Sequence, residues 1–407
     1  MEPTFSYIYS VPYIILFFVY FLLFLKENNL RKKGKDIKYI RYTCVIIFLF
    51  FFGFRGYIDT DFAIYYPLYQ EAPTIFNSSG ITKYFSDIND DFLTRIEPGF
   101  KIFIILIKTL SSDYFLLQFI STLIDVLFLN YFFKKYSPRY ALSFILLLVF
   151  SGLIIEINLL RNSKSIFLFL YSLQFIKDRK IVKFALCNAL GLLLHSSAIF
   201  YFPVYFFLHK KISKPIIWIV FLIGNLIYLT QLKFITPFLT AFSSIIGGSY
   251  ASMAEIYSKT DLYNSGYGIT FGFLERLITF VLFYTSYNKL DDYLQDKKIL
   301  NIFYNSFFLY SVSYLFLSEY SIFIDRITTL FVFSYWILYA QLYEVLNHRL
   351  KTIFATVMLF FGTYKMYKSN NFIIRNYQNI LFDNPSISRA YSTLGKHLDK
   401  ILNPPKN

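Results

Sequence analysis

A short stretch near the N-terminus combines a residue type that binds anions with residue types that accept protons. Residues 54–66 read FRGYIDTDFAIYY and come directly after the apolar run VIIFLFFFG. Arg55 could hold a phosphate group, because a guanidinium is planar, offers several donors and keeps its charge when partly desolvated. Asp59 and Asp61 could accept a proton from a hydroxyl group. The stretch therefore has the chemistry of a site rim as well as that of a polar loop.

Similar groups recur along the chain, mostly at the ends of apolar runs. The further candidates are Glu97, Arg161, His195, Arg276 and the neighbours Asp325 and Arg326. The arginines add possible diphosphate ligands, the carboxylates and the histidine add possible bases, and the tyrosine pair Tyr65–Tyr66 could pack against sugar rings. Arg276 differs from the others because it falls inside an apolar run.

Each candidate also has a structural interpretation that stays open at this point. Asp61 could be a helix N-cap, Glu97 could be a helix start with Pro at the first position, and Arg55 could extend to the membrane interface. Arg161 could lie in a hairpin turn, and His195 could be an interior histidine with its hydrogen bonds satisfied. Arg276 could be paired with a carboxylate, and Asp325 and Arg326 could be charges at the membrane interface.

The composition indicates an all-α, polytopic membrane protein. Of 407 residues, 56% are hydrophobic and 16% are charged, whereas soluble domains carry about 25% charged residues. Apolar runs of about 15–20 residues recur from end to end, which is typical of membrane-spanning helices. We expect one polytopic domain over residues 1–407, with about 11–13 spans.

The net charge of +15 does not indicate nucleic-acid binding. The Lys and Arg residues form short clusters between apolar runs, as the positive-inside rule and anionic lipids require. The cluster KENNLRKKGKDIK after the first span, about 8–25, is therefore expected in the cytoplasm. The N-terminus and the loop after the second span, about 39–54, are then expected outside. Because the first run lacks a basic flank before it, we expect a retained helix.

This topology gathers the candidate groups on one side. The outer loops are expected at about 55–97 and 233–267, and the side of the polar tail at about 368–407 stays open. Residues 99–110 are expected to form a short helix that does not cross, and 181–208 a hairpin of two short arms. All nine candidate charges then lie at the outer face, and charges at membrane depth usually mark a site. They are Arg55, Asp59, Asp61, Glu97, Arg161, His195, Arg276, Asp325 and Arg326.

Arginines, proton acceptors and tyrosines facing the exterior suit a lipid-diphosphate sugar donor that reacts with a sugar hydroxyl. The sequence holds no HExxH, GxSxG, P-loop or paired CxxC pattern. Asp59-Thr60-Asp61 matches the D-x-D spacing of metal-dependent transferases. We expect no metal and no cofactor, because arginine can hold a lipid diphosphate by itself.

Four segments resemble the EpsG-like membrane proteins, a branch of the Wzy-type O-antigen and exopolysaccharide polymerases. They lie in order within about 40–210 and read FRGYIDTDFAIYYPLY, EPGFKIF, NLLRNSKSIFLFLYSLQFIKDRKIVKF and LLLHSSAIFYFPVYFF. In the first segment Asp59 stands where the family often has Gly before Thr-Asp, so Asp61 is the matching acid. In the third, Asn162 stands where Gln is common.

The resemblance implies a fold similar to GT-C-like glycosyltransferases and a reaction outside the bacterial inner membrane. A glycan on undecaprenyl diphosphate would pass to a new lipid-linked repeat unit, making O-antigen, capsule or exopolysaccharide. Candidate diphosphate ligands are Arg55, Arg161, Arg276 and Arg326, and candidate bases are Asp61, Glu97 and His195. The implied partners are the lipid-linked donor and acceptor, membrane lipid and a chain-length regulator, with no nucleic acid.

Three other activities stay open. A flippase for the same lipid-linked units also needs a basic cavity, but it should carry charges through the membrane depth. A ligase or another lipid-donor transferase shares the architecture, and a ligase should have a longer folded outer loop. An acyltransferase should show a histidine centre, for which His195 is slender support.

If arginine alone holds the diphosphate, glycan polymerisation in isolated membranes should proceed at nearly the same rate after EDTA treatment. The measurement is the glycan ladder formed from lipid-linked repeat units before and after chelation. A loss that Mg²⁺ or Mn²⁺ reverses would instead support a metal site at Asp59 and Asp61.

Overall fold

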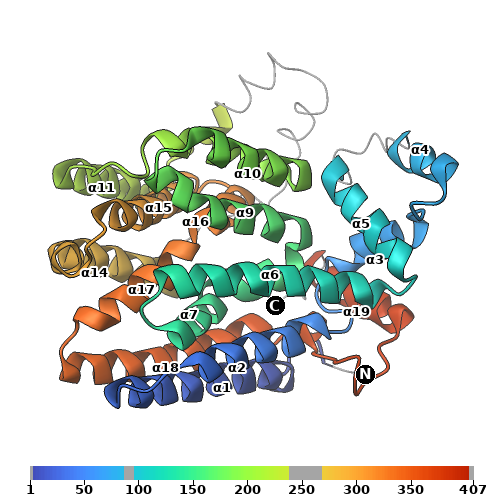
Figure 1. Ribbon diagram of the computed structural model, residues 1–407, viewed down its shortest axis with the longest axis horizontal. Helices are drawn as coiled ribbons and strands as arrows, with labels where there is room; N and C mark the ends of the chain where they lie inside the picture. Colours follow the sequence, from blue (N-terminus) through green and yellow to red (C-terminus); the bar gives the residue numbers. More distant parts are fainter. Residues whose placement is uncertain (1–2, 87–95, 238–267, 403–407) are drawn as a thin grey trace. The chain divides into compact units, whose positions relative to one another are not determined.

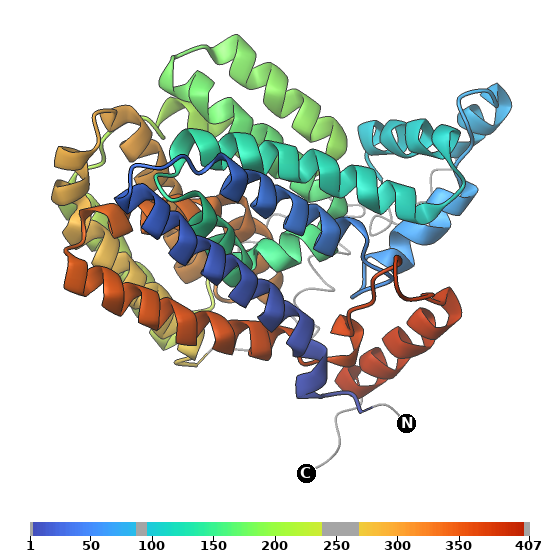
Figure 2. The same ribbon diagram turned by 60° about the horizontal axis from the view of Figure 1, so that its bottom comes forward.

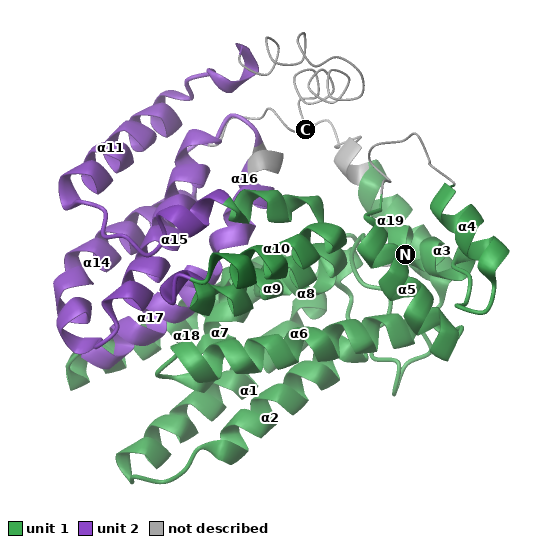
Figure 3. Ribbon diagram, turned by 45° about the horizontal axis from the view of Figure 1, so that its top comes forward, with its two compact units in different colours: residues 1–175, 180–202, 346–407 green, residues 176–179, 203–345 purple. Residues whose placement is uncertain are grey.

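The structure is a computed structural model that describes residues 3–86, 96–237 and 268–402. Within these ranges the chain forms helices joined by turns, with two isolated β-bridges and no longer strand pairing (Figure 1). The predicted all-α class is therefore confirmed. The chain divides into two compact units, which are coloured separately in Figure 3. Unit 1 comprises residues 1–175, 180–202 and 346–407, and unit 2 comprises 176–179 and 203–345.

Unit 1 contains most of the helices and the N-terminal candidate residues. Its helices are α1 (Tyr7–Lys32), α2 (Lys38–Phe48), α3 (Phe62–Glu71), α4 (Ser78–Ser86), α5 (Pro98–Leu110), α6 (Tyr114–Tyr136), α7 (Tyr140–Leu147), α8 (Leu153–Asn158), most of α9 (Leu160–Lys177), α10 (Ile181–Leu194), α18 (His348–Asn370) and α19 (Ile387–Leu402). Unit 2 holds α11 (Lys214–Thr230), α14 (Phe271–Tyr293), α15 (Lys297–Phe316), α16 (Ser321–Phe331) and α17 (Phe333–Val345).

Four helical stretches in the described residues are long and apolar enough to cross a membrane. They are Tyr7–Lys32, Tyr114–Tyr136, Tyr140–Asn158 and Lys297–Phe316, and two shorter apolar helices are Ile181–Leu194 and Lys214–Thr230. Tyr7–Lys32 overlaps the first expected span, and Ile181–Leu194 lies in the expected hairpin at 181–208. The chain is therefore a helical membrane protein. The total of 11–13 crossings stays a prediction.

Two short segments were expected from the sequence, and the structure agrees with one of them. Helix α5 has 13 residues and a length of about 20 Å, less than a hydrocarbon core of about 30 Å. The expected hairpin at 181–208 has a helical first arm, α10, but its second arm consists of two 3₁₀ segments, 196–201 and 203–206. Pro203 begins the second of them, and because proline has no N–H it cannot continue the hydrogen-bond ladder of the first.

Aromatic packing holds α1 against its neighbours in unit 1. Tyr20 on α1 stacks on Phe144 of α7 with ring centres 5.2 Å apart, and both rings are fully buried. On the other side, α1 packs along α18, where a Cβ at Gly362 would lie 2.3 Å from the Phe17 ring. Glycine at this position therefore lets the two helices approach closely.

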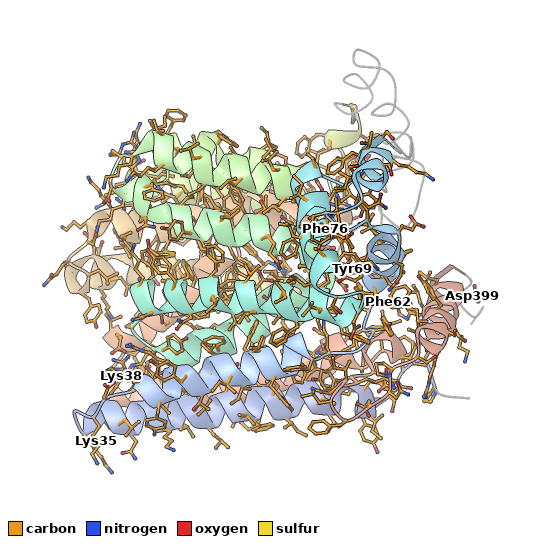
Figure 4. The ribbon with its side chains drawn as sticks, turned by 45° about the vertical axis from the view of Figure 1, so that its right-hand side comes forward. Lys35, Lys38, Phe62, Tyr69, Phe76 and Asp399 are labelled. Atoms are coloured by element: carbon orange, nitrogen blue, oxygen red, sulfur yellow. The ribbon has the colours of Figure 1, made fainter. Side chains whose placement is uncertain are left out.

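The two ends of unit 1 differ in the residues that they carry. Figure 4 places Lys35 and Lys38, in the basic turn between α1 and α2, at the opposite end from Phe62 and Asp399. The basic turn was expected in the cytoplasm and the segment around Phe62 outside. A bundle with these residues at opposite ends is consistent with that prediction.

The polar tail lies at the same end as the N-terminus and Arg55. Phe5 forms a bridge with Phe372, and Arg55 forms one with Asn379. Figure 2 shows the tail and its last helix, in red, beside the start of α1, in dark blue. The sequence left the side of the tail open, and these contacts place the tail with the segment expected outside.

Asp59 joins the Arg55 segment to the tail by its backbone and its side chain. Its N–H donates to Ile374 O at 2.8 Å, and its carboxylate forms a buried ion pair with Arg375. Its φ of 65° lies in the left-handed region, which Gly adopts freely and Asp tolerates better than most residues. This conformation explains why Asp can stand where the family often has Gly.

We expect Asp59→Asn to destabilise the protein. Asparagine tolerates the same backbone conformation but leaves the buried Arg375 charge without its ionic partner, which costs about 3–5 kcal/mol in comparable cases. The measurement is the thermal unfolding midpoint of the purified full-length chain in detergent.

The matched control is Asp36→Asn, which removes an exposed pair with Lys38. Exposed pairs contribute little, so its midpoint should stay close to that of the wild type. Equal midpoint shifts in the two variants would contradict a structural role for the Asp59–Arg375 pair.

Candidate functional site

The site begins with the first residues of three helices in unit 1. Asp61 precedes α3, Glu97 precedes α5, and Arg161 lies in the first turn of α9. Both acids occupy N-cap positions, yet neither side chain forms a capping hydrogen bond with its own helix. The capping interpretation of Asp61 is therefore wrong for its side chain. Glu97 does start a helix, but its carboxylate is used elsewhere.

Arg161 is held by an acid and a phenol from two other helices. Its Nη1 lies 2.5 Å from Glu97 Oε2, and its Nε donates to the Tyr65 hydroxyl at 2.9 Å. The Arg161 and Glu97 side chains are 15% and 16% exposed, so water screens this ion pair only partly. The guanidinium is thus fixed in orientation near the surface, as anion binding requires.

Glu97 also fixes the turn that follows α10. Its second oxygen, Oε1, accepts the backbone N–H of Ser196 at 2.8 Å. The next residues explain the rest of the EPGF segment. Pro98 starts α5, a Cβ on Gly99 would come within 2.6 Å of Leu193 O, and the buried Phe100 packs against Tyr65 with ring centres 5.4 Å apart. Each residue of the segment therefore has a distinct structural use.

The Asp61 carboxyl has the acid–base properties of a neutral-pH proton acceptor. Burial raises its pKa to about 7, and the nearby Asp59 adds to the increase. The N–H of Leu160, 3.4 Å from Oδ2, and the charges of Arg161 and Arg55 oppose this increase. A general base is most efficient when its pKa lies near the working pH.

Glu97 has the opposite character. Burial by itself would raise its pKa, but the Arg161 charge, the Ser196 N–H and His195 more than offset that effect, so its pKa is lowered. Glu97 is thus a stable carboxylate that orients Arg161, and it is a weak proton acceptor at neutral pH.

Arg55 does not extend to the interface. Its side chain is buried, with Nη1 2.5 Å from Phe52 O and 3.2 Å from Thr122 Oγ1. It lines a small cavity together with Asp61, Tyr65 and Gln118. The interfacial interpretation of Arg55 is therefore wrong, and its charge acts on the same cavity as Asp61.

His195 takes part in the turn between α10 and the following 3₁₀ segment. Its Nδ1 lies 2.8 Å from Ser197 Oγ and 3.2 Å from Ser197 N. Ser197 Oγ also donates to Asn162 Oδ1 at 2.7 Å, which ties this turn to the start of α9. The His-x-Ser segment thus orients the residue next to Arg161, and Nδ1 is engaged in that task.

The predicted sugar-binding tyrosines differ in their exposure. Tyr65 is 5% exposed and its hydroxyl accepts from Arg161, so its present contact is with the cation. Tyr66 is half-buried, with its ring centre 5.7 Å from Tyr57 and 5.5 Å from Tyr114. Their roles toward sugar stay predictions.

Arg276 and Arg326 belong to unit 2. The Arg276 guanidinium donates from Nε to the Tyr310 hydroxyl at 2.9 Å and lies 4.1 Å from the centre of the Tyr314 ring. It lines a second small cavity with Asn225. Arg326 is exposed on α16, next to Asp325. Their assignment as diphosphate ligands stays a prediction.

The sequence analysis missed a buried set of polar groups next to the site. Asp125 on α6 forms an ion pair with Lys164 on α9, and Ser163 Oγ donates to Asp125 Oδ2 at 3.1 Å. In the described part of the chain, the two carboxyl oxygens of Glu156 and the amide nitrogen of Gln118, Nε2, are buried without a hydrogen-bond partner. The sequence did carry a signal for this set, because Asp125 in STLIDVLF and Glu156 in GLIIEIN are acidic residues inside apolar runs.

No cluster of three or more potential His, Cys, Asp or Glu metal ligands occurs among the described residues. The two acids of the Asp59-Thr60-Asp61 segment have different partners. Asp59 forms an ion pair with Arg375, and Asp61 accepts a hydrogen bond from the backbone N–H of Leu160.

Helices able to span a membrane, and buried arginine and carboxyl groups at one end of unit 1, define a helical membrane protein with a charged site. The EpsG family model matches residues 38–381, which is most of the chain, so the chain belongs to the EpsG family. The match includes every candidate site residue from Arg55 to Arg326 and confirms the resemblance. No curated protein and no solved structure matches the chain.

Proposed function

We propose that this protein is a glycosyltransferase that polymerises undecaprenyl-diphosphate-linked oligosaccharide repeat units outside the plasma membrane. Membership of the EpsG family supports a broadly polysaccharide polymerase-like role. The observation that carries the proposal is one cavity lined by both Asp61, with a pKa of about 7, and the buried Arg55. A proton acceptor beside a fixed cation suits glycosyl transfer from a diphosphate donor.

The three candidate bases are not equivalent. Asp61 combines a raised pKa with a place in the cavity, whereas Glu97 is committed to Arg161 and Ser196. His195 uses Nδ1 in its own turn. We therefore assign the base to Asp61 and give Glu97 and His195 positioning roles.

In the proposed step, a hydroxyl oxygen of the acceptor sugar forms a bond to the anomeric carbon of the donor glycan. The bond from that carbon to the diphosphate oxygen breaks, and the diphosphate leaves with the electron pair. Asp61 receives the hydroxyl proton. Arg55 and Arg161 stabilise the negative charge that develops on the diphosphate, because fixed cations at a leaving group lower the barrier most in partly desolvated sites.

The remaining parts of the proposal concern unit 2 and the partners. In the proposal, Arg276 and Arg326 contribute to diphosphate binding. The contacts of the Arg276 guanidinium with Tyr310 and Tyr314 fix its orientation and support this role. The donor and acceptor share the lipid undecaprenyl diphosphate, and a chain-length regulator acts with the polymerase. The product is O-antigen, capsule or exopolysaccharide.

Deleting the gene should collapse the surface-glycan ladder to a single repeat unit on an otherwise intact acceptor. A gel of the surface glycan and of the lipid-linked precursors measures this. Complementation with Asp61→Asn should leave the collapse in place, because the variant keeps the shape of the side chain but cannot accept a proton. Loss of all surface glycan, with single units trapped inside, would identify a flippase, and an unchanged ladder would contradict polymerisation.

The pH dependence of the reaction should follow Asp61. The base acts in its ionised form, so with a pKa of about 7 the value of kcat/KM should rise as pH increases and level off above about 7. The measurement is polymerisation by purified protein with lipid-linked repeat units between pH 5 and 9.

Glu97→Gln is the matched control for that profile. It disturbs Arg161 and should lower the rate, yet it should retain the inflection near pH 7, whereas the small residual rate of Asp61→Asn should show no inflection there. An inflection that survives Asp61→Asn would assign the base to another residue.

A further inference from the structure

Residues 377–380 of the tail, which we call the strap, lie against the helix end that precedes Arg55. Helix α2 continues into a π-helical turn, Leu49–Gly53, and Arg55 follows two residues after this turn. The last carbonyl groups of a helix have no N–H partner within that helix. At a packed helix end other groups must supply the donors, because a buried acceptor without a partner costs free energy. Here the donors come from the strap and from Arg55 itself.

Two side chains of the strap donate to carbonyl groups of this turn. The Tyr377 hydroxyl donates to Phe51 O at 2.9 Å, and Asn379 Nδ2 donates to Phe50 O at 3.3 Å. Asn379 Nδ2 also donates to the Tyr377 hydroxyl at 3.1 Å, so the two side chains support each other. The Tyr377 ring stacks on the Phe51 ring with ring centres 4.2 Å apart. The strap therefore both satisfies the helix end and packs on it.

The backbone of the strap pairs with the residues on either side of Arg55. Ile380 N donates to Phe54 O, and Gly56 N donates to Gln378 O, both at 2.9 Å. These two hydrogen bonds flank Arg55 and form its isolated bridge with the strap. The main chain at Arg55 is therefore held by the strap as well as by the helix that precedes it.

The Arg55 side chain turns back to the same helix end. Its Nη1 donates to Phe52 O and to Thr122 Oγ1, whereas Nε and Nη2 form no hydrogen bond with the described part of the chain. Arg55 also lines the cavity that Asp61 lines. One nitrogen thus anchors the guanidinium, and the other two are left as donors for an anion.

Neutral groups alone fix the direction of this buried guanidinium. Arg55 is 4% exposed and forms no ion pair with any of the described residues. Its acceptor Phe52 O belongs to the same turn as the two carbonyl groups that the strap side chains bind. A shift of this turn would therefore move the guanidinium, and no carboxylate would restore its position.

We propose that the strap is a positioning element for the Arg55 guanidinium, with Tyr377 and Asn379 as positioning residues that act through the Leu49–Gly53 turn. The inference rests on the proposed function, in which Arg55 stabilises the leaving diphosphate, and it adds part of the tail to that machinery. Neither positioning residue was a candidate in the sequence analysis, because their acceptors lie 326 and 329 residues away in the chain.

The first test compares Tyr377→Phe with the wild type in polymerisation by purified full-length protein with lipid-linked repeat units. The variant keeps the ring that stacks on Phe51 and loses only the hydroxyl. Its kcat should fall about 5-fold, the loss expected for one ordinary hydrogen bond, with KM nearly unchanged, because Arg55 acts on charge that develops in the transition state. The inflection near pH 7 should remain, because Asp61 is unchanged.

A double-mutant cycle shows whether the hydroxyl acts through Arg55. Arg55→Gln should lower kcat strongly, and Tyr377→Phe should then have no further effect in that background. A general loss of stability would instead lower kcat by the same factor in both backgrounds, and that result would overturn the proposal. Asn379→Ala should show the same dependence on Arg55, and it takes the place of Tyr377→Phe if that variant does not fold.

Matched controls remove the same chemical groups from exposed positions. Tyr367→Phe removes a hydroxyl from α18, and Asn384→Ala removes an amide from the tail. Within the described part of the chain neither side chain forms a hydrogen bond. Both variants should therefore polymerise with the kcat of the wild type.

Amide hydrogen exchange separates this proposal from the proposed function, because it requires no turnover. Tyr377→Phe should speed exchange of the Gly56 N–H, which the strap binds, and leave exchange in α10 unchanged. If Arg55→Gln lowers kcat but both strap variants polymerise as the wild type does, the strap proposal alone is overturned. If Arg55→Gln and gene deletion both leave the glycan ladder intact, the proposed function is overturned, and amide exchange still decides whether the strap holds the chain at Arg55.

Discussion

The ion pair between Arg161 and Glu97 is the interaction on which the site depends. Through it the first turn of α9 is joined to the start of α5, and the second oxygen of Glu97 adds the turn after α10. Tyr65 brings α3 to the same cation. Removing one partner would leave a partly desolvated charge without compensation, which costs more than the pair contributes. The pair therefore sets where four segments meet.

Two carboxyl groups at equivalent positions, each just before a helix, have different acid–base properties because their surroundings differ. Glu97 faces a guanidinium and a backbone N–H, which stabilise its charge. Asp61 is buried near a second acid and receives one long hydrogen bond, so its neutral form is favoured more. A pair of acids with separated pKa values is a common basis for dividing acid–base and orienting roles. This difference, more than any motif, is the reason why we propose Asp61 as the base.

The sequence predicted the helical class, the positions of several helices and the segments that form the N-terminal part of the site. Apolar runs and basic clusters report the membrane environment directly, and the short EPGF and HSS segments report tight local packing. The sequence did not predict that the tail covers Asp59, because Arg375 lies far along the chain and the partner of a buried charge has no local signal. The sequence also did not indicate that the Asp61 side chain would accept a hydrogen bond from the backbone of α9 instead of capping α3.

The buried pair Asp125–Lys164 suggests why the start of α9 can serve as a fixed platform. Arg161 and Asn162 face the site and the turn after α10, while the next two residues, Ser163 and Lys164, are bonded to Asp125 on α6. One helical turn is thus held from two sides by charge-assisted bonds in a region with little water, where such bonds are strong and broken ones are costly. In the proposed function Arg161 binds a bulky lipid diphosphate, and a cation with this role benefits from such support.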